Sequence, residues 1–76
     1  MRLIEPREDF DKCIIGIVSG GGRAVYDTEL VIETFMRTEG WDYDSALDFF
    51  YTNTLSSAQY DEDGPIFMSK EFELED

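Results

Sequence analysis

The sequence predicts a small α+β domain in the order ββαα: a β-hairpin, or a three-stranded antiparallel sheet, packed against an antiparallel helix pair. Three observations lead to this prediction. Two runs of β-prone residues flank the glycine run at 20–22, and two later stretches repeat apolar residues with a helical period. A third short apolar run after Pro65 is suited to a C-terminal edge strand. At 76 residues the chain is expected to form one domain around a small core.

The first third of the chain is expected to form an arm and then the hairpin. Residues 1–11 mix many charges with a proline and predict an irregular arm, and residues 12–26 contain the two β-prone runs. Because the run at 13–18 is apolar throughout, we expect a strand that is central or buried on both faces. A helix over 10–18 stays open as an alternative, since apolar residues also recur there with helical spacing. The β-branched residues and Gly16 favour the strand.

Two amphipathic helices are predicted next, over residues 27–39 and 42–53. Each begins with an aspartate that can accept hydrogen bonds from the first turn, followed by a stripe of apolar residues at helical spacing. Gly40 is suited to end the first helix in the left-handed conformation. Since the connection is very short, we expect the helices to lie antiparallel and in contact.

The remaining segment, residues 54–76, is expected to contain an acidic turn, a short extended segment and a frayed tail. The turn spans 61–64, the extended segment follows Pro65 at 66–68, and the tail is the acidic run 70–76.

Residue composition argues against cofactors and metal centres. A single cysteine and the absence of histidine make a disulfide, a structural zinc or a haem improbable, and Cys13 among isoleucines is expected to be a small buried hydrophobe. The acidic turn is a poor calcium loop, because Phe72 stands where the final bidentate glutamate would follow Asp61. We therefore expect no cofactor and no metal.

Catalysis and membrane insertion are also not expected. Acid pairs such as Asp44 and Asp48 lie on a solvent-facing side of the predicted helix, where nothing would shift their pKa values apart. No segment approaches the ~20 apolar residues that span a bilayer, and the first residues lack a signal-peptide core. The expected compartment is the cytoplasm, that of the host cell if the protein is encoded by a phage.

Charge is distributed very unevenly along the chain. Residues 1–26 hold four acidic and four basic side chains, whereas residues 27–76 hold fourteen carboxylates against Arg37 and Lys70, which accounts for the net charge of −12. Such a field repels nucleic acid and anionic membrane and attracts basic proteins. Fourteen carboxylates match the charge of roughly 24 Å of duplex DNA. The expected partner is a basic, nucleic-acid-binding protein.

Candidate partner-binding residues fall into two sets. The acidic set lies on the polar sides of the predicted helices and in the acidic turn, and comprises Glu29, Glu33, Asp42, Asp44, Asp48, Asp61, Glu62 and Asp63. The apolar set contains aromatic residues that lie outside or at the edge of the core-facing stripe. They are expected to contact a partner or a second copy of the chain, as in a homodimer, and they are Trp41, Phe49 and Tyr51.

Four segments carry a resemblance to a known group of proteins. They are Cys13–Val18, Ala24–Asp27, Tyr43–Asn53 with the pattern Tyr-x-x-Ala-x-x-Phe-x-x-x-Asn, and Gly64–Phe67. With these segments the chain resembles a group of short, uncharacterised phage and prophage proteins over residues 12–68. The resemblance implies a hairpin, two helices, the second ending at Asn53, and a Pro-containing tail.

The resemblance implies a phage origin. Small acidic phage proteins commonly inhibit host machinery, including CRISPR effector complexes, so the resemblance also implies an inhibitor. The leading hypothesis is a non-enzymatic inhibitor that binds a basic host protein through an acidic helical face, as a DNA mimic. The alternative is a homo-oligomeric phage structural or accessory protein whose acidity only keeps it soluble.

Overall fold

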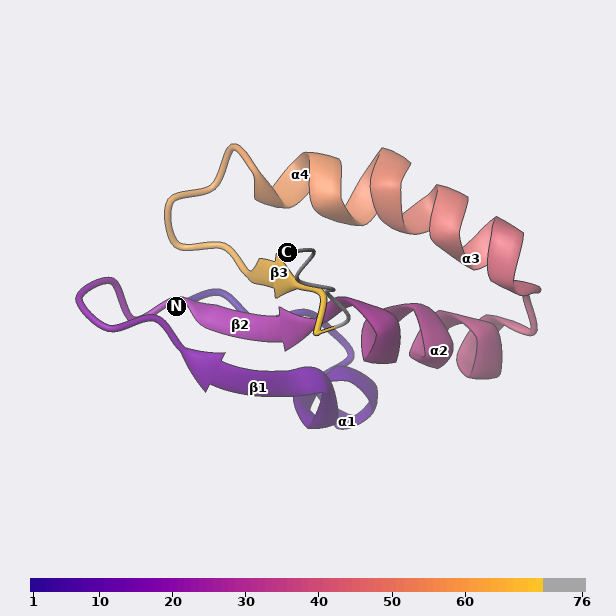
Figure 1. The fold of residues 1–76 in the computed structure, drawn as a ribbon, viewed down its shortest axis with the longest axis horizontal. Coiled ribbons are helices and arrows are strands. Elements are labelled where there is room, and N and C mark those ends of the chain that lie inside the picture. Colours follow the sequence, from indigo (N-terminus) through magenta and orange to yellow (C-terminus); the bar gives the residue numbers. More distant parts are fainter. Residues whose placement is uncertain (71–76) are drawn as a thin grey trace, which may run out of the picture.

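A three-stranded mixed sheet in the order β1-β2-β3 organises the computed structural model, which describes residues 1–70 (Figure 1). Strands β1 (Ile14–Ile17) and β2 (Ala24–Asp27) are antiparallel, and β3 (Ile66–Met68) pairs with β2 in parallel. The predicted α+β class is confirmed. The fully antiparallel sheet is wrong, because the helical segment between β2 and β3 returns the chain to the starting end of β2. The predicted frayed tail falls almost wholly on residues 71–76, outside the described residues.

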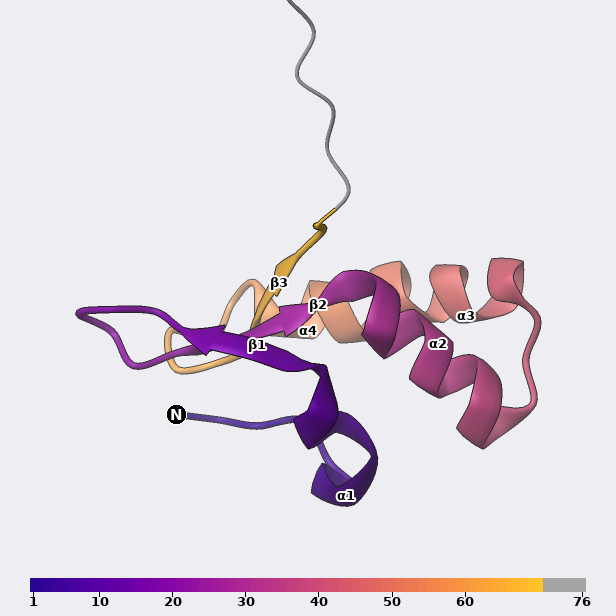
Figure 2. The same ribbon diagram turned by 60° about the horizontal axis from the view of Figure 1, so that its bottom comes forward.

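The predicted hairpin is confirmed, but β1 takes an edge position instead of the expected central one. Gly20 and Gly22 adopt positive φ angles of 85° and 69° in the connecting loop, which extends away from the helices in both views (Figures 1 and 2). The register slips between Ile14 and Gly16, as in a β-bulge, and Ile17 is 52% exposed. The central place belongs to β2, whose Tyr26 is fully buried.

The amino-terminal arm contains helical turns that were not predicted. Helix α1 (Arg7–Phe10) leads into the 3₁₀ turn η1 (Asp11–Cys13) and then directly into β1. The alternative helix over 10–18 is therefore right only for its first residues. Cys13 is buried as expected, with its Sγ 3.4 Å from Thr34 Oγ1, and burial raises the pKa of its thiol.

Helix α2 (Thr28–Glu39) confirms the first predicted helix closely. The Asp27 carboxylate accepts from the backbone N–H groups of Glu29 and Leu30 at 3.0 and 3.4 Å. Gly40, with φ 71°, ends the helix by donating its N–H to Met36 O at 3.0 Å.

The second predicted helix starts as expected and continues further. Helix α3 (Tyr43–Phe49) leads into η2 (Phe50–Leu55), a π-helical segment, and then into α4 (Ser56–Ala58). Asn53 thus lies inside a helical run, and the expectation that it ends the helix is wrong. A wider π turn adds about one residue per turn. The added residue turns Leu55 toward the core that also holds Phe50, and Ala58 is buried as well.

Aromatic rings connect the helices to the sheet. The ring of Phe35 on α2 lies 5.3 Å from those of Phe10 and Phe49, between centroids. On the other helical segment, Phe50 contacts Phe67 of β3 at 4.9 Å, edge to face. The chain reverses direction between α2 and α3, so the α3 to α4 run passes back above α2 and the sheet in Figure 1.

Candidate protein-binding surface

Four carboxylates on α2 and α3 form no ion pair within residues 1–70, although Arg37 stands one helical turn after Glu33. Glu29 and Glu33 are four residues apart on α2, as are Asp44 and Asp48 on α3, which separates each pair by about 6 Å along its helix axis. Within residues 1–70, no basic side chain comes within ion-pair distance of any of the four. Three of them are exposed and Glu29 is half-buried. These four charges are therefore unpaired within the described part of the fold.

Asp42 also has a structural role. Its Oδ1 accepts from the Ser45 backbone N–H at 2.8 Å and so caps α3. This hydrogen bond from the Ser45 N–H, together with one from the Ser45 side chain, lowers the pKa of Asp42 below its ordinary value. Asp42 stays charged at neutral pH and lies just before the Asp44 and Asp48 pair.

Asp61 is engaged within the fold. Its carboxylate forms an ion pair with Arg2 at 2.9 Å and accepts from the Asp63 backbone N–H at 3.0 Å. Its backbone carbonyl accepts from Arg23 Nη2 at 3.1 Å and from the Gly64 N–H at 3.0 Å. This residue holds the turn and the amino-terminal arm together, so its contribution to a partner contact is limited.

The acidic turn lies far from the connection between the acidic helices. Glu62 and Asp63 are exposed and carry no ion pair in residues 1–70. Figure 1 shows their loop, between α4 and β3, at the end of the fold opposite the turn that joins α2 and α3. The eight predicted acids do not form one group, because the helical run from α3 to α4 carries the chain to the other end.

Two of the three predicted apolar contact residues pack inside the fold. Trp41 and Phe49 lie 5.0 Å apart between ring centroids, and both contact Phe35, so they join α3 to α2. Both are half-buried. Tyr51 is 55% exposed and uses one ring contact, with Phe50 at 5.3 Å. Of the three, Tyr51 offers the most surface to a partner.

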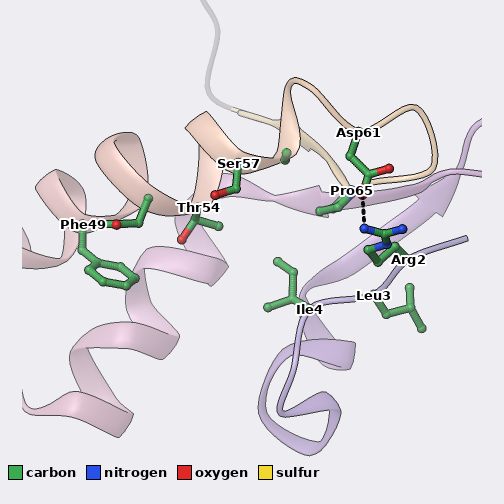
Figure 3. A pocket seen from close by; sticks show the side chains of 10 residues that line it. Arg2, Leu3, Ile4, Phe49, Thr54, Ser57, Asp61 and Pro65 are labelled. Atoms are coloured by element: carbon green, nitrogen blue, oxygen red, sulfur yellow. Dashed lines mark ion pairs between the residues drawn. The ribbon is translucent and has the colours of Figure 1, made fainter.

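A groove between the amino-terminal arm and the helical run was not predicted (Figure 3). Its volume is about 360 Å³, and it is lined by Arg2, Leu3, Ile4, Phe49, Asn53, Thr54, Ser57, Ala58, Asp61 and Pro65. Sequence reasoning missed it for two reasons. The arm was expected to be irregular, and the helix was expected to stop at Asn53, before the residues that form the second half of one wall.

Within residues 1–70, no three His, Cys, Asp or Glu side chains are grouped so that they could hold a metal. Among the helices of that same range, none is long and apolar enough to cross a membrane.

Comparisons with protein-family models, with curated proteins and with solved structures each found no match to this chain. The resemblance to short phage proteins stays a prediction from the sequence.

Proposed function

We propose that this protein is a non-enzymatic, phage-type inhibitor that binds a basic, nucleic-acid-binding host protein such as a CRISPR effector complex. The contact residues are the acidic side chains of α2 and α3. One observation carries the proposal: Glu29, Glu33, Asp44 and Asp48 have no ion-pair partner among residues 1–70. Glu29 and Asp44 also favour the starts of α2 and α3, where the helix dipole attracts negative charge, whereas Glu33 and Asp48 lie beyond the first turns and are not explained in this way.

The spacing of the charges suits a protein that resembles DNA in its negative field and not in the positions of its phosphates. Each helix carries two acids about 6 Å apart along its axis, and because the chain reverses between α2 and α3 the two pairs follow one another along the helix pair, at about one charge per 5 Å. Duplex DNA carries one per ~1.7 Å. The four acids thus supply roughly a third of the line charge of DNA, which attracts a nucleic-acid site without matching it phosphate by phosphate.

The two kinds of contact residue have different effects on binding. Uncompensated carboxylates at a rim raise the association rate and select a basic partner. An exposed aromatic ring that becomes buried slows dissociation. Tyr51, on the segment that follows Asp44 and Asp48, is the residue that we assign to the second effect.

The test is a capture experiment with a matched charge control. Tagged wild type is compared with Asp44→Asn/Asp48→Asn and with Glu5→Gln/Glu8→Gln, which changes the net charge equally but in the neutral third of the chain. Host proteins bound at low salt are identified, and duplex DNA is then added as a competitor. We expect wild type and the Glu5/Glu8 control to retain a nucleic-acid-binding protein that DNA displaces, and the Asp44/Asp48 variant to lose it.

Equal retention by all three proteins would contradict the assignment to the helices. Equal loss in both variants would mean that net charge alone governs binding. Retention that duplex DNA leaves unchanged would rule out competition for a nucleic-acid site.

A homo-oligomeric accessory protein is the second candidate, and exposed apolar side chains favour it. They are Ile17, Leu30, Tyr51, Tyr60 and Met68, among others. Salt separates the two functions: raising ionic strength weakens a complex held by exposed charges and leaves an apolar oligomer intact. Light scattering at low and high salt gives the mass in each condition, and a concentration-dependent multimer at both favours the oligomer.

A further inference from the structure

We propose that the groove between the amino-terminal arm and the η2 to α4 segment binds one bulky apolar side chain of the partner, from a peptide segment in which Lys or Arg flanks that residue. The inference rests on the proposed function, since it names the part of the basic partner that is recognised. It adds a site that the acidic helices do not include.

The groove is held open by contacts of its own walls. On the arm, Ile4 donates its backbone N–H to Tyr26 Oη at 2.8 Å, and Arg2 donates its backbone N–H to Asp63 O at 2.9 Å. The Arg2 ion pair with Asp61, drawn in Figure 3, ties the same arm to the loop before β3. Because these contacts are made between residues of the fold itself, they hold both walls in place, which lowers the entropic cost of binding.

The size and lining of the groove suit a single large side chain. Its volume of about 360 Å³ lies near the lower end of the ~300–1,000 Å³ that ligand pockets occupy. Leu3 and Ile4 line it from the arm and Phe49 from α3, on the opposite side in Figure 3. An aromatic or large aliphatic side chain placed there would bury apolar surface against both walls, which favours binding.

Hydroxyl groups beside this apolar surface suit the main chain of a peptide. Thr54 and Ser57 line the same groove, and neither hydroxyl has a hydrogen-bond partner within residues 1–70. Figure 3 shows both side chains projecting from the helical segment that forms one wall of the groove. A hydroxyl both donates and accepts, so it can pair with either group of a peptide bond that binding removes from water.

Charge complementarity indicates that the flanking residues of the ligand are basic. Asp61 lines one end of the groove, and the exposed Glu62 and Asp63 continue the chain there without ion-pair partners in the described range. Because Asp61 is neutralised by its ion pair with Arg2, a Lys or Arg next to the inserted residue would meet Glu62 and Asp63, whereas an acidic peptide would be repelled by them.

The test is a titration with three synthetic peptides of the same length. The first has a central Trp between Lys and Arg residues, the second replaces Trp with Ala, and the third keeps Trp and replaces the basic residues with Gln. Affinity is measured by calorimetry at fixed salt. We expect the basic Trp peptide to bind roughly tenfold or more tightly than the basic Ala peptide.

Two serine variants place the binding in the groove. Ser57 lines the groove and Ser56 does not, and both are exposed on α4, so Ser57→Phe fills the site while Ser56→Phe is the matched control. Circular dichroism establishes that both variants fold. We expect Ser57→Phe to reduce the affinity for the basic Trp peptide to that for the basic Ala peptide, and Ser56→Phe to leave it unchanged.

The outcomes separate the groove from the proposed function. Equal affinities for the basic Trp and Ala peptides, or equal effects of the two serine variants, would overturn the groove and leave the charge-based function standing. Equal affinities for the basic and Gln-substituted Trp peptides would confirm an apolar site and overturn the requirement for a basic partner.

Discussion

Arg2, at the start of the chain, forms an ion pair of 2.9 Å with Asp61, in the turn before the last strand. Asp61 is therefore the acid of the turn whose loss should reduce stability. We predict that Asp61→Ala lowers the free energy of unfolding by about 1 kcal/mol, through the lost ion pair and the lost hydrogen bond from Asp63 N–H. Urea denaturation measures the change.

The neighbouring Glu62 provides the control, because it is exposed and unpaired within residues 1–70. We expect Glu62→Ala to stay within about 0.5 kcal/mol of wild type. Similar losses in both variants would mean that the ion pair contributes nothing measurable.

Asp27 joins the central strand to α2, and its carboxylate is buried while it caps the helix. Asp27→Ala is expected to cost about 1–2 kcal/mol of folding free energy, since two backbone N–H groups lose their acceptor. Asp27→Asn keeps an acceptor oxygen and gives up only a 3.6 Å ion pair with the largely exposed Lys70, so it should cost much less. Thermal or urea denaturation of both variants checks this order, and a reversed order would contradict the capping role.

Alanine variants of two adjacent aromatic residues on η2 should have different effects, one on stability and the other on binding. Phe50 is 1% exposed and packs on Phe67, so Phe50→Ala is expected to cost about 3–5 kcal/mol and to leave much of the protein unfolded. Tyr51 is mostly exposed, and Tyr51→Ala should change stability by about 0.5 kcal/mol or less. Circular dichroism on melting distinguishes them. Under the proposed function, Tyr51→Ala should also release a captured partner faster, and a Tyr51 variant with unaltered dissociation would remove that residue from the contact.

The cap of α3 predicts a specific pH dependence. The hydrogen bond from the Ser45 N–H lowers the pKa of Asp42 in the folded state, so the charged carboxylate favours folding. This contribution is fully present above the unfolded pKa of about 3.9 and is lost as the pH falls through the lower folded value. Carbon-13 NMR of the Asp42 carboxyl group measures the folded pKa directly. Asp42→Asn should abolish this component of the acid dependence, and an unaltered acid profile would contradict the assignment.

Local signals in the sequence were sufficient for the hairpin and for α2. Asp27 and Gly40 bound α2 as predicted, because a cap and a left-handed terminus depend on residues within one turn. The glycine run likewise formed the hairpin loop. The position of β1 in the sheet was not predictable in this way, because burial of a strand depends on which segment pairs on its other side.

The missed half of the groove has a different cause. An α-helix repeats its apolar residues every 3.6 positions. After Phe50 the apolar residues no longer follow this period, because the π-helical segment begins there. With the π-helical segment included, Leu55 packs against the core and Ala58 is buried. The pattern that seemed to fade at Thr54 was shifted by one residue, and Thr54 and Ser57 were consequently left out of the candidate site.

Parallel pairing of β2 with β3 has a consequence for the order of folding. The strands are neighbours in space, yet Asp27 and Ile66 are separated by all of α2, α3, η2 and α4. Contacts of such long sequence separation form late, because closing the long loop costs entropy and local structure has to form first to reduce that cost. A chain emerging from the ribosome could form its hairpin and helices early, but its sheet would stay incomplete until Ile66–Met68 had been synthesised.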